Sequence, residues 1–313
     1  MISNNNNWEK LGRFLSPAKE IFWLESCTGS ACAIPESEKE SIFKLYVTGR
    51  DKNNRSFIGK ILIKISDSGE ISILEISKEP VLKLGELGSF DENGTSYPYV
   101  ICENDFEKMY YTGWMPSVLT PFQNQLGLAI KKKEETEFSR YSKAPILSRT
   151  NEDNLSIGSV CVLKEKSKWH LWYTSFIKWK QTQTKPKHYY LIKYAYSSDG
   201  INWKRENKVC IDFSNRGEYA IAKPSVIKIN EYYHMYFCFR GNKYKIGYAY
   251  SKDRVYWKRD DSLAGISYSK EGWDSEEMCY PFVFRHKEFL YMLYCGNDYG
   301  KEGLGLARLK IKL

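Results

Sequence analysis

Five aromatic-rich segments recur at nearly constant spacing, and this repeat limits the fold more than any other feature of the sequence. Their last residues are 64, 62, 64 and 57 positions apart, by subtraction along the chain. Runs rich in Tyr, Phe, Trp and Val are typical of strands, and a fixed period of this length indicates one supersecondary unit copied five times. The segments are FKLYVTGR, EKMYYTGW, WHLWYTSF, YHMYFCFR and LYMLYCGN, which end at Arg50, Trp114, Phe176, Arg240 and Asn297.

Two further landmarks keep the same register. In three copies a Pro lies 16 residues before the end of the aromatic run, at Pro98, Pro224 and Pro281. A third segment follows each run, and in two copies it leads into a turn and a Trp, as SSDGINW and SKDRVYW. The Asp199-Gly200 pair in the first of these turns is a hairpin signal, because a type I′ turn requires positive φ there. Each unit is therefore predicted to be a four-stranded antiparallel meander.

These units predict an all-β protein, a five-bladed β-propeller of four-stranded antiparallel blades. A β-sandwich is the alternative, but it does not explain equal repeats. The last repeat supplies only three strands before Leu313, so we expect residues 8–17 to add the missing outer strand and close the ring. The whole chain, residues 1–313, is then one propeller domain, with blades that begin near residues 27, 94, 156, 220 and 277.

Composition narrows the classes of partner. Hydrophobic residues make up 42% and charged residues 27% of the chain, which is typical of a packed globular protein. The net charge of +9 comes from Lys and Arg that are spread along the chain with carboxylates between them, whereas nucleic-acid binders usually gather them on one element. We therefore expect no nucleic-acid partner. The excess charge is explained either by solvated lysines or by attraction of phosphate-bearing substrates.

The cysteines and histidines do not form a metal-binding motif. The chain has eight Cys and four His, but no CxxC pair, so we expect no metal site and no cofactor. The start MISNNNNWEKLGRF lacks a basic region followed by an apolar run, which is the pattern of a secretory signal. No apolar stretch reaches the length of a membrane span. We expect a cytoplasmic protein whose cysteines are reduced.

The ends of the five aromatic strands are predicted to form a ring around a central funnel, because they occupy the same position in every blade. Two guanidiniums, two aromatic rings and an amide suit a ligand that has a ring face and an anionic group. Packing between blades is the alternative for the aromatic members; we prefer it for Phe176 and leave it open for Trp114. The candidate binding residues are Arg50, Asp51, Arg55, Tyr111, Trp114, His188, Arg240 and Asn297.

Carboxylates recur in the loops that lead into the inner strands. Asp91, Asp153 and Asp274 each lie seven residues before the inner-strand landmark, and Glu218 lies six before it. Glycoside hydrolysis uses a proton donor and a second carboxylate as base or nucleophile. We therefore take Asp91, Glu218, Asp274 and Glu276 as candidate catalytic residues, with Glu218 as acid or base. The alternative is that these carboxylates cap turns or pair with neighbouring Arg and Lys.

The chain resembles bacterial five-bladed propeller proteins related to glycoside hydrolase families 43 and 32, which often lie in loci for surface polysaccharides such as capsule and lipopolysaccharide. The resemblance rests on WEKLGRFLSP, GRDKNNRSFIG, LGELGSFDENG, YYTGW, IKYAYSSDGINW, GEYAIAKP, FRGNKYKIGYAYS, GWDSEEMCYP and YCGNDYGKEGLGLA. It implies a pocket for sugars. In family 43 an Asp typically precedes the inner-strand Pro, whereas this chain has Tyr97, Lys223 and Tyr280 there, which argues against the usual hydrolytic mechanism.

Three functions follow from these observations. The first is a carbohydrate-active enzyme of polysaccharide biosynthesis that acts on a nucleotide-, lipid- or phosphate-linked sugar by glycosyl transfer or glycosidase-like chemistry. The second is a sugar-binding or scaffolding propeller without catalysis, and the third is an ordinary glycoside hydrolase. Two carboxylates close together in the funnel would favour an enzyme, whereas a funnel lined only by Arg, Tyr and Trp would favour a binding protein.

Overall fold

The protein is built almost entirely of antiparallel strands, which confirms the predicted all-β class. The structure is a computed structural model that describes residues 7–215 and 217–311. The remaining parts of the predicted 1–313 domain, residues 1–6, 216 and 312–313, lie outside the described residues. Within the described ranges the helical segments are short: η1 (Phe22–Leu24), η2 (Asp261–Leu263) and α1 (Asn297–Gly300). None of the helices in that part of the chain is long and apolar enough to cross a membrane.

The strands form consecutive four-stranded meanders. The first contains β2 (Cys27–Ser37), β3 (Ile42–Arg50), β4 (Ser56–Ile65) and β5 (Ile71–Ile76), and the second β6 (Gly94–Glu103), β7 (Phe106–Pro116), β8 (Phe122–Lys132) and β9 (Ser139–Arg140). The third contains β10 (Ile157–Glu165), β11 (Lys168–Lys180), β12 (Lys187–Ser197) and β13 (Lys204–Ile211). The fourth contains β14 (Ala220–Ile229), β15 (Tyr232–Arg240), β16 (Tyr244–Ser251) and β17 (Lys258–Arg259). The last contains β18 (Cys279–His286), β19 (Phe289–Cys295), β20 (Leu304–Lys310) and β1 (Glu9–Leu15).

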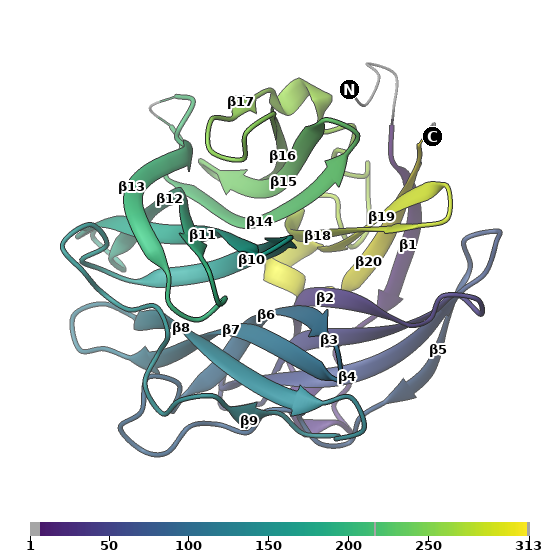
Figure 1. Ribbon diagram of the computed structural model, residues 1–313, viewed down its shortest axis with the longest axis horizontal. Coiled ribbons are helices and arrows are strands. Elements are labelled where there is room, and N and C mark those ends of the chain that lie inside the picture. Colours follow the sequence, from purple (N-terminus) through teal and green to yellow (C-terminus); the bar gives the residue numbers. More distant parts are fainter. Residues whose placement is uncertain (1–6, 216, 312–313) are drawn as a thin grey trace.

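The meanders are arranged radially. Each first strand contacts the first strand of the next meander, and β18 contacts β2, so the inner strands close a ring. Figure 1 shows β2, β6, β10, β14 and β18 around the centre and the fourth strands at the periphery. This arrangement is a β-propeller. We interpret each meander as one blade, which gives five blades.

The N-terminal strand completes the last meander. Strand β1 pairs antiparallel with β20, from Glu9 opposite Arg308 to Leu15 opposite Leu304. Figure 1 shows β1 and β20 side by side, although they lie at opposite ends of the chain. The pairing supplies the outer strand that the C-terminal repeat lacks, as the sequence predicted.

The core lies between neighbouring meanders, where an aromatic side chain from one sheet packs against an aromatic side chain of the next. Sheets that are apolar on both faces must bury both, and stacking them radially achieves this. Five ring pairs with centroids 5.1 to 6.1 Å apart join the successive meanders: Tyr46–Phe138, Tyr110–Trp203, Trp172–Trp257, Trp8–Tyr236 and Phe43–Phe284.

Every inner strand carries a β-bulge near its start. The register against the second strand breaks between Ser96 and Tyr99 in β6, and at the matching place in β2, β10, β14 and β18. In three strands the residue before Pro has a positive φ, at Tyr97 (51°), Lys223 (53°) and Tyr280 (56°). A bulge redirects a side chain, so the side chains of these three residues depart from the regular alternation between the two faces of the sheet.

The turn after β12 differs from the one predicted at Asp199-Gly200. Gly200 has a φ of 74°, but Asp199 is not among the residues with positive φ, so the turn is not type I′. Instead the Asp199 carboxylate accepts hydrogen bonds from the N–H groups of Ile201 and Asn202 at 2.8 Å. This local bonding by an Asp side chain competes with a tight hairpin.

Candidate functional site

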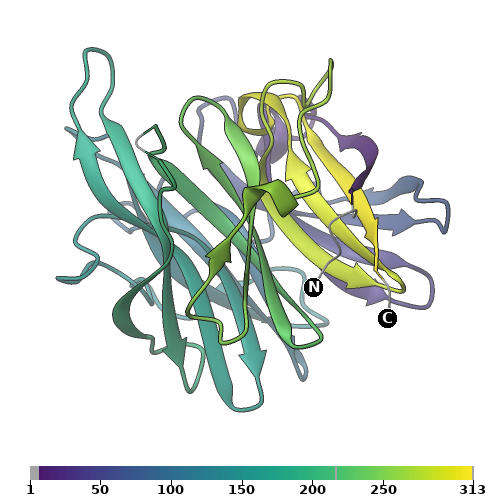
Figure 2. The same cartoon turned by 90° about the horizontal axis from the view of Figure 1, so that it is seen from above.

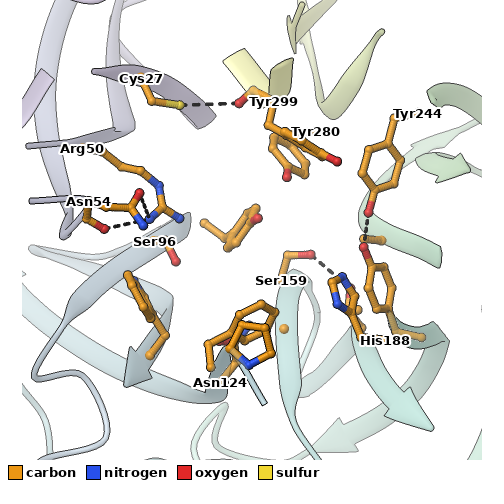
Figure 3. Close-up of a pocket in the computed structure, with 18 of the residues that line it drawn as sticks. Cys27, Arg50, Asn54, Ser96, Asn124, Ser159, His188, Tyr244, Tyr280 and Tyr299 are labelled. Atoms are coloured by element: carbon orange, nitrogen blue, oxygen red, sulfur yellow. Dashed lines mark hydrogen bonds between the residues drawn. The ribbon is translucent and has the colours of Figure 1, made fainter. Parts of the chain in front are cut away.

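A cavity of about 690 Å³ lies at the centre of the propeller, where the second strands end and the first strands begin. Residues from all five meanders line it. Figure 3 shows side chains from both sides of the cavity pointing toward its centre. Of the predicted binding residues, the cavity wall contains Arg50, Trp114, His188 and Arg240, and it also contains Phe176.

Arg50 and Trp114 form one wall. The Arg50 guanidinium lies 5.4 Å from the centre of the Trp114 ring and donates to the backbone and side-chain oxygens of Asn54 at 2.9 and 3.0 Å. The Trp114 indole N–H donates to the Ser56 hydroxyl at 2.7 Å, which fixes the ring. A cation stacked on an aromatic face keeps its charge available to a ligand. Arg50 is therefore positioned without being neutralised.

Arg240 lies in an aromatic cage on another side of the cavity. Its guanidinium carbon is 4.7 to 5.4 Å from the ring centres of Tyr244, Tyr219 and Tyr299, and it donates to the Tyr299 hydroxyl. The carboxylate of Glu277 accepts hydrogen bonds from the N–H groups of Tyr244 and Tyr299 rather than from Arg240. Within residues 7–215 and 217–311, neither Arg50 nor Arg240 bonds to a carboxylate.

Besides Tyr299, four tyrosines bring hydroxyl groups to the cavity wall. Tyr97 and Tyr280 reach it from the bulges of β6 and β18, and their rings meet edge to face at 5.2 Å. Tyr190 and Tyr244, from the start of two third strands, share a hydrogen bond between their hydroxyls. Burial raises the pKa of Tyr97 to about 12 and raises the pKa of Tyr190, Tyr244 and Tyr280 above the ordinary value of 10.0. These phenols are protonated at neutral pH, so they can donate to an anion or a sugar hydroxyl.

His188 belongs to an aromatic cluster at the cavity edge. Its ring stacks on Tyr190 at 5.2 Å and contacts Trp179 and Phe176 at 5.0 and 5.8 Å. Burial, and then the positive charges of Arg240 and Lys187, lower its pKa to about 4. His188 is therefore neutral at physiological pH and adds no charge to the cavity.

The lining residues carry more positive than negative charge. The cationic side chains are Arg50, Lys185, Arg240 and Lys301, whereas the single carboxylate among the described lining residues is Asp298. Asp298 and the following Tyr299 both have positive φ, 56° and 61°, a strained conformation for residues with a Cβ. Lys301 pairs with the Asp298 carboxylate at 3.3 Å. The described cavity lining thus carries net positive charge.

The expected convergence of the entry-loop carboxylates on the funnel is wrong. Asp91, Glu218 and Asp274 do not line the cavity, and each bonds instead to a cation on the outermost strand of its own meander. The same arrangement occurs at Asp153, so it is a structural brace between the start and the end of the sheet that recurs in four of the five meanders. The pairs, with N···O distances of 2.7 to 3.2 Å, are Asp91–Arg140, Asp153–Arg205, Glu218–Arg259 and Asp274–Lys10.

A second-strand tyrosine completes most of these braces, and this is the place of the predicted binding residue Tyr111. The Tyr111 hydroxyl donates to the Asp91 carboxylate at 2.9 Å, and Tyr294 donates to Asp274 at 3.0 Å. Tyr111 is fully buried, so it is a structural donor and does not reach the cavity. The spacing that predicted a catalytic ring marks a packing motif.

The other predicted residues also lie outside the cavity wall. Asp51 accepts from the N–H groups of Asn53 and Arg55 and from the Arg55 guanidinium at 2.8 to 2.9 Å, which closes the turn after β3. Glu276 is exposed and pairs with Lys243. Strand β19 ends at Cys295, so Asn297 lies beyond it, at the first position of α1, where its side-chain oxygen accepts from the N–H groups of Glu276 and Glu277.

Sequence reasoning missed most of the cavity tyrosines. Tyr190 and Tyr244 are 54 positions apart, which is the offset that relates the turns after β12 and β16, so that repeat was an available signal. Phe176, for which packing between blades was preferred, lines the cavity.

Lys223, at the bulge of β14, is fully buried, and its ammonium has no hydrogen-bond partner within the described residues. No cluster of three or more metal-ligating side chains occurs in that part of the chain.

Two curated proteins match the chain over almost its whole length. They are the uncharacterized proteins MT1551 and Rv1502 of Mycobacterium tuberculosis, each 36% identical over 303 residues, which cover 97% of this chain and 99% of the relative. The chain belongs to the family of these mycobacterial proteins. No family model matches it.

Solved structures with the same fold come from glycoside hydrolases. The chain superimposes with a TM-score of 0.60 on a thermostable family-43 glycoside hydrolase, at 16% identity and with 91% of this chain and 93% of that chain covered. The TM-score is 0.63 for the GH32 beta-fructofuranosidase BmSUC1 of Bombyx mori, at 13% identity and with 98% and 62% covered. A structure described for the GH130 family of mannoside phosphorylases gives 0.70, at 15% identity and with 97% and 93% covered. At these identities the likeness establishes the propeller fold of the family.

Proposed function

We propose that this protein is a carbohydrate-active enzyme whose central cavity takes a sugar linked to phosphate. The observation that carries the proposal is that Arg50 and Arg240 line one cavity, stacked on aromatic rings, with no carboxylate partner among the described residues. Guanidiniums bind phosphate in a bidentate manner. The aromatic faces suit a sugar ring, and the protonated phenols suit its hydroxyls. Nucleotide-, lipid- or phosphate-linked sugars all carry this anionic group.

A phosphate leaving group also matches the shortage of carboxylates. Hydrolysis of an ordinary glycoside needs an acid and a second carboxylate, whereas the described cavity wall offers Asp298 alone. A phosphate departs as a stable anion and needs no proton donor. In the proposed step, the Asp298 carboxylate accepts the proton of an acceptor hydroxyl, whose oxygen bonds to the anomeric carbon. The bond from that carbon to the phosphate oxygen breaks, and the phosphate leaves with the electron pair toward the guanidiniums.

We propose that the protein works in the assembly of surface polysaccharides in the cytoplasm. All eight cysteines are free thiols, and seven of them are buried. Such a set suits a reducing compartment, where thiols remain unpaired. Activated sugars linked to nucleotides or lipid phosphates are the donors of glycosyl transfer in that setting, which fits a cavity with excess positive charge.

A sugar-binding protein without catalysis is the second candidate, favoured by the presence of only one carboxylate among the described lining residues.

Thermal unfolding in the presence of sugar phosphates, nucleotide sugars and the matching neutral sugars tests both candidates, combined with phosphate-release assays on the same compounds. We expect stabilisation by the anionic compounds, and phosphate or nucleotide release with an acceptor present. The Asp298→Asn variant should retain binding and lose turnover by about 10²- to 10⁴-fold.

Each outcome decides one part of the proposal. Stabilisation without release, in wild type and Asp298→Asn alike, would leave the binding protein. Hydrolysis of neutral glycosides with no response to anionic ones would favour an ordinary glycoside hydrolase and contradict the phosphate assignment.

A further inference from the structure

The connection between β7 and β8 exposes two aliphatic side chains almost completely. Val118 is 99% and Leu119 is 85% exposed, at the tip of a hairpin whose base pairs Pro116 with Phe122. Neither side chain gains burial from the rest of the chain. Exposed apolar side chains in a cluster indicate a surface that contacts a partner or a membrane.

The neighbouring β11–β12 hairpin is strongly basic. Between Phe176 and His188 the sequence is IKWKQTQTKPK, which contains four lysines and no carboxylate. Lys178, Lys180 and Lys185 are exposed. In Figure 2, the edge-on view, this hairpin is the long teal loop at the upper left. Its charge is therefore presented to the outside rather than neutralised within the hairpin.

The two hairpins lie side by side at the cavity mouth. The Phe122 ring packs against Trp179 and His188 with centroids 5.5 and 5.6 Å apart. Pro121 from one hairpin and Lys185 from the other both line the cavity. An apolar tip and a basic hairpin thus share one rim of the candidate site.

We infer that this rim docks onto the surface of a lipid bilayer containing anionic phospholipids. Aliphatic side chains enter the headgroup boundary while adjacent lysines pair with lipid phosphates, and membrane affinity grows with both contributions. A soluble polyanion would use the lysines but not Val118 and Leu119, and a protein groove would not require four unopposed lysines. The combination favours a membrane surface.

Docking in this orientation turns the cavity mouth toward the lipid headgroups. The inference goes beyond the proposed function, because it concerns where the protein works and does not depend on what the cavity binds. It would give the site direct access to a sugar held on a lipid phosphate.

Co-sedimentation with vesicles tests the inference on the full chain without any sugar. Vesicles of phosphatidylcholine mixed with phosphatidylglycerol should carry the protein into the pellet at low ionic strength, and vesicles of phosphatidylcholine alone should not. High salt should release most of the bound protein, because salt screens the attraction between the lysines and the anionic lipids.

Matched variants separate the two contributions. Lys178→Glu/Lys180→Glu should lower the partition coefficient at least tenfold, since each lysine near an anionic surface contributes about fivefold. Leu119→Asp should also lower it at low salt. The control for the lysine variant is Lys39→Glu/Lys64→Glu, which makes the same change of charge at exposed positions just beyond β2 and near the end of β4. The control for Leu119→Asp is Leu74→Asp, which replaces a leucine that is 51% exposed on β5.

Three results would overturn the inference. The first is the absence of pelleting with anionic vesicles at low salt. The second is equal partitioning of the hairpin variants and their controls, with unchanged circular dichroism spectra. The third is loss of binding in the lysine variant with full retention in Leu119→Asp, which would assign the rim to a soluble polyanion.

Discussion

The Glu218 carboxylate accepts hydrogen bonds from both terminal nitrogens of the Arg259 guanidinium, at 2.8 and 3.1 Å. Both side chains are largely buried, and Ser214 donates to the same carboxylate. Burial raises the pKa of Glu218, but the bonds from Arg259 and Ser214 outweigh it and hold the pKa below the ordinary value of 4.5. A carboxylate held ionised in this way braces the sheet and is poorly suited to donate a proton.

Glu218→Gln should therefore reduce stability and leave function intact. Replacing one partner of a buried charged hydrogen bond should lower the free energy of unfolding by about 2 kcal/mol at neutral pH. Because the folded pKa lies below the unfolded one, the stability that the ionised carboxylate contributes is present above pH 4.5 and is lost as the pH falls below it. Urea unfolding at several pH values measures this.

The exposed Glu276 provides the control for that variant. Glu276→Gln should change the free energy of unfolding by no more than about 0.5 kcal/mol, since its ion pair with Lys243 is solvent-screened. A loss of ligand binding or turnover in Glu218→Gln, with normal stability, would restore Glu218 as a catalytic residue.

Arg240→Met should remove the anion selectivity of the cavity. Loss of a charge-assisted hydrogen bond costs about 1.5 to 3 kcal/mol, or about 10- to 100-fold in affinity for a sugar phosphate. The affinity for the matching neutral sugar should change little, because Tyr244 and Tyr299 remain. Isothermal titration measures both ligands, and Arg285→Met, at an exposed position of β18, is the control. Equal losses for the anionic and neutral ligands would contradict the assigned role.

The pH dependence of binding should identify the anion. His188, with a pKa of about 4, stays neutral above that pH and contributes no titration of its own. A phosphate monoester gains its second charge near pH 6, so its affinity should rise between about pH 5 and pH 7. A sugar carboxylate is already ionised in this range, so its affinity should stay level. A sugar phosphate whose affinity falls as the pH rises would indicate that a cavity residue releases a proton instead.

Buried histidines should make the protein sensitive to mild acid. Burial lowers the pKa of His170, His188 and His234 to about 4, against an ordinary value of 6.5. The unfolded chain then binds protons that the folded chain does not, so stability should fall as the pH drops from 6.5 toward 4. Urea midpoints across this range test it. His234→Gln should show a shallower slope, and an unchanged slope would show that His234 is not buried in the neutral form.

Lys223 should destabilise the protein at neutral pH. Its ammonium is fully buried without a hydrogen-bond partner in the described part of the chain, and burial lowers its pKa from 10.5. The unfolded chain binds the extra proton between the folded pKa and 10.5, so stability should rise with pH in that window. Lys223→Met should increase the free energy of unfolding at neutral pH and remove the rise. Lower stability of the variant would show that the ammonium has a partner, such as a bound anion.

The positions of the strands could be predicted closely from the sequence. The inner strands start at Cys27, Gly94, Ile157, Ala220 and Cys279, against predicted blade starts near 27, 94, 156, 220 and 277. This worked because a strand is specified by local side-chain alternation, and the repeat fixes its register five times over. The strand ends Arg50, Trp114 and Arg240 could be placed at the cavity for the same reason.

The carboxylates could not be placed in this way. Asp91, Glu218 and Asp274 share a sequence offset, but that offset does not say whether a side chain turns to the funnel or to the outermost strand. The bonding cations, Arg140, Arg259 and Lys10, lie 49, 41 and 264 residues away. Only the closed sheets bring these pairs together.

The sequence by itself determined the all-β units, their order and the basic, aromatic character of the strand ends, because these depend on neighbouring residues and on the repeat. Apart from those strand ends, the tertiary structure alone decided which side chains face the cavity. Bulges in β6 and β18 redirect Tyr97 and Tyr280 into it, and outward ion pairs withdraw the carboxylates from it. The physical reason is that a buried charge must be compensated, and the partner that compensates it is set by packing between segments far apart in the chain.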